Sequence, residues 1–275
     1  MLLLLARAIY RRCRDYFYLF KAFNICSFGF KYAGSTRRFL ESSDESGLIV
    51  ALTVARSSCN RLVNVGANAG FYAILADSLG FSVLAFEPEY YMFKRLLYNI
   101  RINDCMCIPI PLALSSENVR SDFYGSGTAG TLIPGISGNL LFDRQRVTCI
   151  KPDDIILANS IAFDFWILDC EGSEFKVIEG AHKLLKDTIP IIALEYLPSR
   201  SSSESQSLIG NLIMHEYNAF LSSRDIAIGI FEMYPIVSLS SLPPRASTDN
   251  LVFVSSQWHL PFLDNLKHRL SLDVA

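Results

Sequence analysis

The chain has 275 residues, of which 51% are hydrophobic and 19% charged, so one α/β domain with extensions fits its length better than two full domains. Its net charge of −2 gives no reason to expect a nucleic-acid partner. The seven cysteines are odd in number and scattered, which fits neither a zinc site nor a disulfide framework and is typical of buried reduced thiols.

The start of the chain is strongly basic. Residues 1–38 contain eight Lys or Arg and one Asp, a net charge of +7, which leaves −9 for residues 39–275. The first apolar run precedes its arginines and is too short for a secretory signal, and no run reaches the roughly 18 residues of a membrane span. We therefore expect a cytoplasmic protein with a basic, aromatic-rich helical extension over residues 1–43. Residues 1–30 could rest on a membrane surface, and the alternative is a helix that packs on the domain or on a partner.

In chain order, the apolar runs predict strands alternating with helices. Helices are expected over 44–58, 71–79, 89–103, 173–185 and 206–215, with a short helix opening at Asp153-Asp154. Strands are expected over 61–65, 81–86, 107–114, 164–169, 190–195, 217–222 and 251–255, and hairpins or loops over 115–150. This alternation indicates a mostly parallel sheet with helices on both faces and room for one antiparallel strand near the C-terminus. We assign residues 44–258 to this domain and 259–275 to a C-terminal tail.

A glycine-containing turn, Val63 to Gly70, follows the first of these strands. Open α/β sheets bind nucleotides at such turns, and Gly66 and Gly70 allow a ligand to approach the backbone. The spacing G-x-x-x-G differs from the G-x-G-x-x-G of dinucleotide sites, whose helix N-terminus holds a pyrophosphate. S-adenosylmethionine has no phosphate, and its amino-acid tail and ribose would lie against these glycines. A tight turn without a ligand is the alternative.

Acidic residues end three of the predicted strands. Glu87 lies 17 residues after Gly70, where an acid can accept hydrogen bonds from both ribose hydroxyls. The alternative is a carboxylate that interacts with the dipole of the next helix.

The fourth strand delivers three carboxylates, Asp169, Glu171 and Glu174, to one edge of the sheet. They could hold the cofactor's ammonium, orient an acceptor hydroxyl or act as a base, because crowding raises the pKa of a carboxyl group. Helix capping is the alternative, most of all for Glu174. Glu195 ends the fifth strand in the same way, and we expect it to face the acceptor unless it is a solvated strand-end acid.

Together these motifs resemble the FkbM-type methyltransferases, a family of class I S-adenosylmethionine-dependent enzymes, over roughly residues 45–255. The matching segments are Asn64 to Gly70, Phe86-Glu87-Pro88, Ala113-Leu114-Ser115, Asp169 to Glu174, and Glu195. The resemblance implies a Rossmann-like class I methyltransferase fold with a seven-stranded sheet, and usually O-methylation of sugars or secondary metabolites. The residues that it implies around the cofactor are Asn64, Gly66, Asn68 and Gly70 at the turn, Glu87 at the ribose and Ser115 near the adenine. It also implies that Asp169 faces the region of methyl transfer.

The chain departs from the family at two positions. Asn64 stands where the family usually has Asp, so the cofactor's amino-acid end would meet a neutral amide. Ile167 stands where the family tends to have Lys. Both departures concern affinity or activity and not the fold.

We therefore predict an S-adenosylmethionine-dependent methyltransferase that O-methylates a sugar or small metabolite, with Asp169, Glu171 and Glu195 as its catalytic residues. His182 and His215 are weaker candidates because they lie in predicted helices away from the strand ends. The prediction includes no metal, although Asp169, Glu171 and Glu195 have the oxygen ligands that suit Mg²⁺.

Two other functions stay open. A nicotinamide-dependent oxidoreductase would need the absent G-x-G-x-x-G, and a non-catalytic binding protein that kept the fold would be consistent with Asn64.

Overall fold

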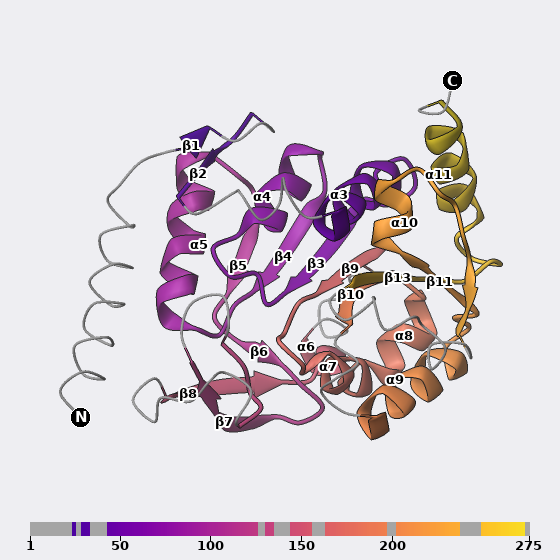
Figure 1. The fold of residues 1–275 in the computed structure, drawn as a ribbon. Coiled ribbons are helices and arrows are strands. Elements are labelled where there is room, and N and C mark those ends of the chain that lie inside the picture. Colours follow the sequence, from indigo (N-terminus) through magenta and orange to yellow (C-terminus); the bar gives the residue numbers. More distant parts are fainter. Residues whose placement is uncertain are drawn as a thin grey trace.

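The computed structural model describes residues 24–25, 29–33, 43–125, 130–134, 144–155, 163–196, 202–236 and 249–272. The main sheet has the strand order β12-β11-β13-β10-β9-β3-β4-β5. Figure 1 shows its strands running through the middle of the molecule between two layers of helices. The strand bounds are β3 (Arg61–Val65), β4 (Ser82–Phe86), β5 (Ile108–Ile110), β9 (Phe165–Leu168), β10 (Ile191–Tyr196), β11 (Ala219–Ser222), β12 (Tyr234–Pro235) and β13 (Asp249–Val254).

The sheet is parallel except near the C-terminus. All pairings from β5 through β4, β3 and β9 to β10 are parallel, and β13 lies antiparallel between β10 and β11. This confirms the predicted α/β fold. The two-residue edge strand β12, antiparallel to β11, is an eighth strand in addition to the seven that the sequence predicts.

Side chains alternate between the two faces of each central strand. In β9, Phe165 and Ile167 join one core cluster, whereas Trp166 and Leu168 join the other. The first cluster is covered by helices α3 (Ser43–Ala55), α4 (Phe71–Ser78), α5 (Tyr90–Ile102), α10 (Ser223–Ala227) and α11 (Leu260–Leu272). The second is covered by helices α6 (Pro152–Ile155), α7 (Glu174–Gly180), α8 (His182–Thr188) and α9 (Ser202–Met214). Burial on both faces explains why these strands are almost wholly apolar.

Two predicted elements are divided in the structure. The strand expected over 107–114 ends at Pro111, which has no N–H to donate, and continues as β6 (Ala113–Leu114) in another sheet. There β6 pairs with β8 (Arg144–Ile150), which pairs with β7 (Val119–Tyr124). The helix expected over 173–185 breaks at Ala181 into α7 and α8.

Both ends of the chain differ from their predicted assignment. The residues expected to form a C-terminal tail build α11, which buries Phe262, Leu263 and Leu266 in the core. At the other end, β1 (Asn24–Ile25) pairs antiparallel with β2 (Lys31–Tyr32), within the expected helical extension. Residues 1–23 of that extension lie outside the described residues.

Candidate active site

The glycine turn joins the ends of three neighbouring strands. The backbone N–H groups of Gly66 and Ala67 both donate to the carbonyl oxygen of Phe86, at 3.0 and 2.9 Å. Gly66 has φ +76°, and a Cβ there would lie 1.9 Å from the carbonyl oxygen of Asp169. A side chain at Gly66 is therefore excluded by both conformation and space, and the turn can approach the end of β9.

Gly70 packs closely against helix α5. It has φ +92° at the start of α4, and a Cβ would lie 2.5 Å from the Leu96 side chain of α5. It does not line the opening described below.

Glu87 is buried at the end of β4 and connects the turn to α5. Its Oε2 accepts a hydrogen bond from the Asn68 N–H, and its Oε1 accepts one from the Glu89 N–H, both at 2.7 Å. Burial raises its pKa to about 7, although these two hydrogen bonds favour the charged form. Because a carboxylate offers about four acceptor positions, two are left for a ligand's hydroxyl groups.

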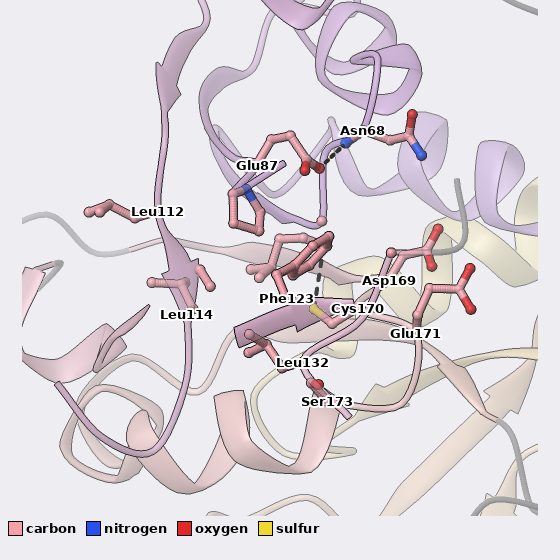
Figure 2. A pocket seen from close by; sticks show the side chains of 15 residues that line it. Asn68, Glu87, Leu112, Leu114, Phe123, Leu132, Asp169, Cys170, Glu171 and Ser173 are labelled. Carbon is pink, nitrogen blue, oxygen red and sulfur yellow. Dashed lines mark hydrogen bonds between the residues drawn. The ribbon is translucent and has the colours of Figure 1, made fainter. Parts of the chain in front are cut away.

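The loop after β9 and the end of β10 bring three acidic side chains together. One carboxylate oxygen from each of Asp169, Glu171 and Glu195 lies within 4.8 Å of the others, and all three residues are partly exposed. In Figure 2 the Asp169 and Glu171 carboxylates lie side by side and point the same way. The structure thus brings together the three predicted catalytic residues, and their oxygens are also the ones that could hold a divalent cation.

Glu174 is held apart from this group. Its Oε1 accepts hydrogen bonds from the Cys170 N–H at 2.7 Å and the Gly172 N–H at 3.3 Å. Burial, with a smaller effect of the nearby Glu195 charge, raises its pKa to about 7. Glu174 therefore holds the loop in shape, and it does so through N–H groups of the loop rather than by capping α7.

An opening lies at these strand ends and has two chemically different sides. Asn68, Glu87, Asp169 and Glu171 line one part of it, and Figure 2 shows Leu112 and Leu114 on the opposite side. The other lining residues are Val65, Gly66, Pro88, Ala113, Phe123, Gly130, Leu132, Cys170 and Ser173. The buried Ser173 hydroxyl has no hydrogen-bond partner within the described part of the chain, so a ligand in the opening can bind it.

Three contributors to the site were not predicted from the sequence. Phe123 and Leu132 line the opening from the second sheet and the segment paired with it. Between them in sequence, Thr131 is fully buried and donates from Oγ1 to the Glu171 carbonyl oxygen at 2.9 Å. Its backbone pairs with Tyr124, so it joins the second sheet to the acidic loop. These residues lie within 115–150, where the sequence predicts hairpins or loops, and no pattern in a single sequence identifies these individual residues as part of a site.

Besides Gly70, two predicted cofactor residues lie beside the opening rather than on it. Asn64 is buried within β3, between Ala85 of β4 and Ile167 of β9. Ser115 is also buried, and its N–H donates to the Ile150 carbonyl oxygen at 3.0 Å. Neither residue lines the opening, so direct contact with a ligand there stays a prediction.

The two histidines considered as bases contact each other. His215 Nε2 and His182 Nδ1 lie 3.0 Å apart, and burial lowers the pKa of His215. Neither lines the opening, which leaves its carboxylates as the better candidates for proton transfer.

Comparison of the sequence with models of known protein families found a match to one family. The family model described as the methyltransferase FkbM domain matches residues 64–222. A search of curated proteins found no significant match.

Solved structures that resemble the chain include several methyltransferases. One is methyltransferase FkbM from Methylobacillus flagellatus KT, with 17% identity and a TM-score of 0.48, over 71% of this chain and 44% of that one. Our chain thus spans less than half of that protein. A second is precorrin-6y C5,15-methyltransferase from Geobacter metallireducens GS-15, with 11% identity and a TM-score of 0.42, over 81% and 94% of the two chains. A third is the Pyrococcus abyssi tRNA (uracil-54, C5)-methyltransferase in complex with S-adenosyl-L-homocysteine, with 14% identity and a TM-score of 0.38, over 76% and 37%.

Proposed function

The chain belongs to the FkbM methyltransferase family, and from this membership we propose that it transfers a methyl group from S-adenosylmethionine to a hydroxyl oxygen of a sugar or small metabolite. The observation that carries the proposal is the meeting of the glycine turn, Glu87, Asp169 and Glu171 around one opening, with the Glu195 carboxylate next to the last two.

The opening fits this cofactor in charge and polarity. S-adenosylmethionine carries a sulfonium and an ammonium group, and Glu87, Asp169 and Glu171 give the opening negative charge where they are ionised. The faces of an adenine ring are apolar, as are Leu112 and Leu114. The cofactor would supply an activated methyl group.

Individual residues can be assigned on this basis. Glu87 would accept hydrogen bonds from the ribose hydroxyls with its two remaining acceptor positions. Gly66 and Asn68 would lie against the amino-acid end, and the Ser173 hydroxyl would bind a polar atom of the ligand. Each assignment uses a residue that lines the opening.

The acidic group supports an acceptor with several hydroxyls. Three carboxylates within 4.8 Å of one another can accept hydrogen bonds from neighbouring hydroxyls, as a sugar presents them. Asp169 or Glu171 would take the proton of the attacking hydroxyl, and Glu195 would orient the acceptor. Alignment of the acceptor with the methyl group would lower the barrier by several kcal/mol.

Neither alternative function has specific support from the site. Asn64, which favours a non-catalytic protein, does not line the opening, so its neutral amide leaves the lining unchanged. The turn lacks the G-x-G-x-x-G of a nicotinamide-dependent oxidoreductase.

Transfer of a labelled methyl group to paired acceptors tests the proposal. We expect product from glycosides, with the label on oxygen, and little from analogues that have hydrogen in place of the hydroxyl. Asp169→Asn should lower kcat about 10²- to 10⁴-fold, whereas the exposed Asp187→Asn on α8 should match the unmodified protein. Label on nitrogen or carbon, or full activity in both Asp169→Asn and Glu171→Gln, would contradict the proposal.

A further inference from the structure

Helix α5 presents a stripe of basic and amphipathic side chains on its outer surface. Its exposed residues are Tyr90, Lys94, Leu97 and Arg101, spaced so that they fall along one side of the helix. The Lys94 ammonium lies 4.3 Å from the centre of the Tyr90 ring. The helix has three basic residues and no acidic one, so its outer side is both positively charged and partly apolar.

Lys31 and Ala33, which lie within the basic start of the chain, are bound to the C-terminal part of this same helix. The Lys31 N–H donates to Asn103 Oδ1 at 2.8 Å, and Asn103 Nδ2 donates back to the Lys31 carbonyl oxygen at 2.7 Å. The Ala33 N–H donates to Asn99 Oδ1, also at 2.8 Å. Figure 1 shows the β1–β2 pair at one end of α5. The residues that lead into the basic segment are therefore bound to the helix that carries the stripe.

Charge is distributed unequally over the molecule. Residues 1–38 carry +7 and residues 39–275 carry −9, although α5 itself is positive. An anionic surface would attract the side of the molecule that holds α5 and β2 and repel the rest, which would favour one orientation.

We propose that the α5 stripe, with residues 1–38, binds the surface of a bilayer that contains anionic lipids. Lysine and arginine can reach headgroup phosphates while their aliphatic stems lie among apolar groups, and Tyr90 and Leu97 suit the boundary between headgroups and acyl chains. None of the described helices is long and apolar enough to span a bilayer.

The stripe begins close to the candidate active site. Tyr90 follows Pro88, which lines the opening, by two residues. If the proposed methyl transfer holds, lipid binding would bring the rim of the opening close to the bilayer and favour acceptors presented there. Lipid binding itself does not depend on methyl transfer and can be tested separately.

Co-sedimentation of the full chain with vesicles tests the proposal. The vesicles are phosphatidylcholine alone, or phosphatidylcholine mixed with phosphatidylserine. Each basic residue near an anionic surface contributes a factor of about five in binding, so Lys94→Glu/Arg101→Glu should weaken binding at least about 25-fold. The matched control is Lys183→Glu/Lys186→Glu, which reverses two exposed charges on α8 and should bind as the unmodified chain does. Leu97→Ser should weaken binding without any change in net charge.

The expected pattern is binding to mixed vesicles only, weakened by salt and by the α5 variants. Equal effects of the two double variants would contradict the proposal, because only net charge would then matter. Absence of vesicle binding, or binding to nucleic acid in preference to vesicles, would also overturn it. A further contradicting result would be that removal of residues 1–23 abolishes vesicle binding while the α5 double variant binds fully, because the α5 stripe would then not contribute.

Discussion

Gly66 lies where the ends of β3, β4 and β9 meet, and its backbone takes a conformation that favours glycine. Gly229 has nearly the same conformation, φ +79° against +76°, but a Cβ there would meet nothing within 4 Å. A side chain at Gly229 would therefore cause backbone strain alone, whereas a side chain at Gly66 would cause both strain and a steric clash.

We predict that Gly66→Ala costs far more stability than Gly229→Ala. The strain of a left-handed alanine is about 1–2 kcal/mol at either position, and Gly66→Ala adds a clash with the Asp169 backbone. Chemical denaturation measures both variants. Equal losses of unfolding free energy would show that the turn relaxes away from β9 at little cost.

Glu174 gives a prediction about pH. Its folded pKa, about 7, is above the usual value of 4.5, so the folded state binds the proton more tightly than the unfolded chain does. This stabilisation is present below pH 4.5 and is lost as the pH rises through 7. Glu174→Gln should therefore be more stable than the unmodified protein at pH 8, by up to roughly 3 kcal/mol, and the difference should vanish near pH 4.

The difference between the two proteins must be measured, because other groups titrate in the same range. Burial lowers the pKa of His215 and His259, which by itself raises stability with pH. Urea denaturation from pH 4 to 8 isolates the Glu174 contribution. A constant difference over this range would mean that Glu174 ionises normally.

Thr131 is predicted to position Glu171 rather than to touch the substrate. Thr131→Val keeps the shape but removes the hydroxyl that donates to the Glu171 carbonyl oxygen. We expect kcat to fall about tenfold, stability to fall by about 1–3 kcal/mol, and Thr131→Ser to restore most of both. Unchanged kcat in a destabilised Thr131→Val variant would assign Thr131 to folding alone.

At the scale of elements, α11 is the helix that the sequence analysis assigned to a C-terminal tail. Leu266 lies on the buried side of α11 and is fully buried, whereas Asp264 on the same helix is exposed. If α11 belongs to the domain, Leu266→Ala should cost about 2–5 kcal/mol and Asp264→Ala less than about 0.5 kcal/mol. Thermal denaturation of the two variants measures this. Similar small losses of stability in both variants would mean that residues 259–275 are a tail and not part of the domain.

The buried strands were predictable because their apolar runs are short and bounded by glycine, proline or acids. The break between α7 and α8 was not predictable, because the helical spacing of apolar residues continues through Ala181. The role of Gly180 is seen only when the segment packed against it is known. A Cβ on Gly180 would lie 2.2 Å from the Ser115 carbonyl oxygen, a contact across 65 positions in sequence. Long-range contacts of this kind leave no local pattern.

At the scale of the whole molecule, the site combines two sheets, and the sequence indicated only one of them. Asp169, Glu171 and Glu87 were predictable because strand ends in a parallel sheet meet at one edge. Phe123 and Leu132 come from the second sheet and its paired segment, whose place beside the opening follows from tertiary packing alone. Hence the sequence indicated the polar part of the opening and missed Phe123 and Leu132 in its apolar part.

Calorimetric titration with S-adenosylmethionine, with NAD as the control ligand, tests the central claim most directly. We predict binding of S-adenosylmethionine and none of NAD. Glu87→Gln should weaken the binding about tenfold or more, a loss of roughly 1.4 kcal/mol, whereas Asp187→Asn should not. Folded protein that binds no S-adenosylmethionine, or that binds it equally well without the Glu87 carboxylate, would contradict the site described here.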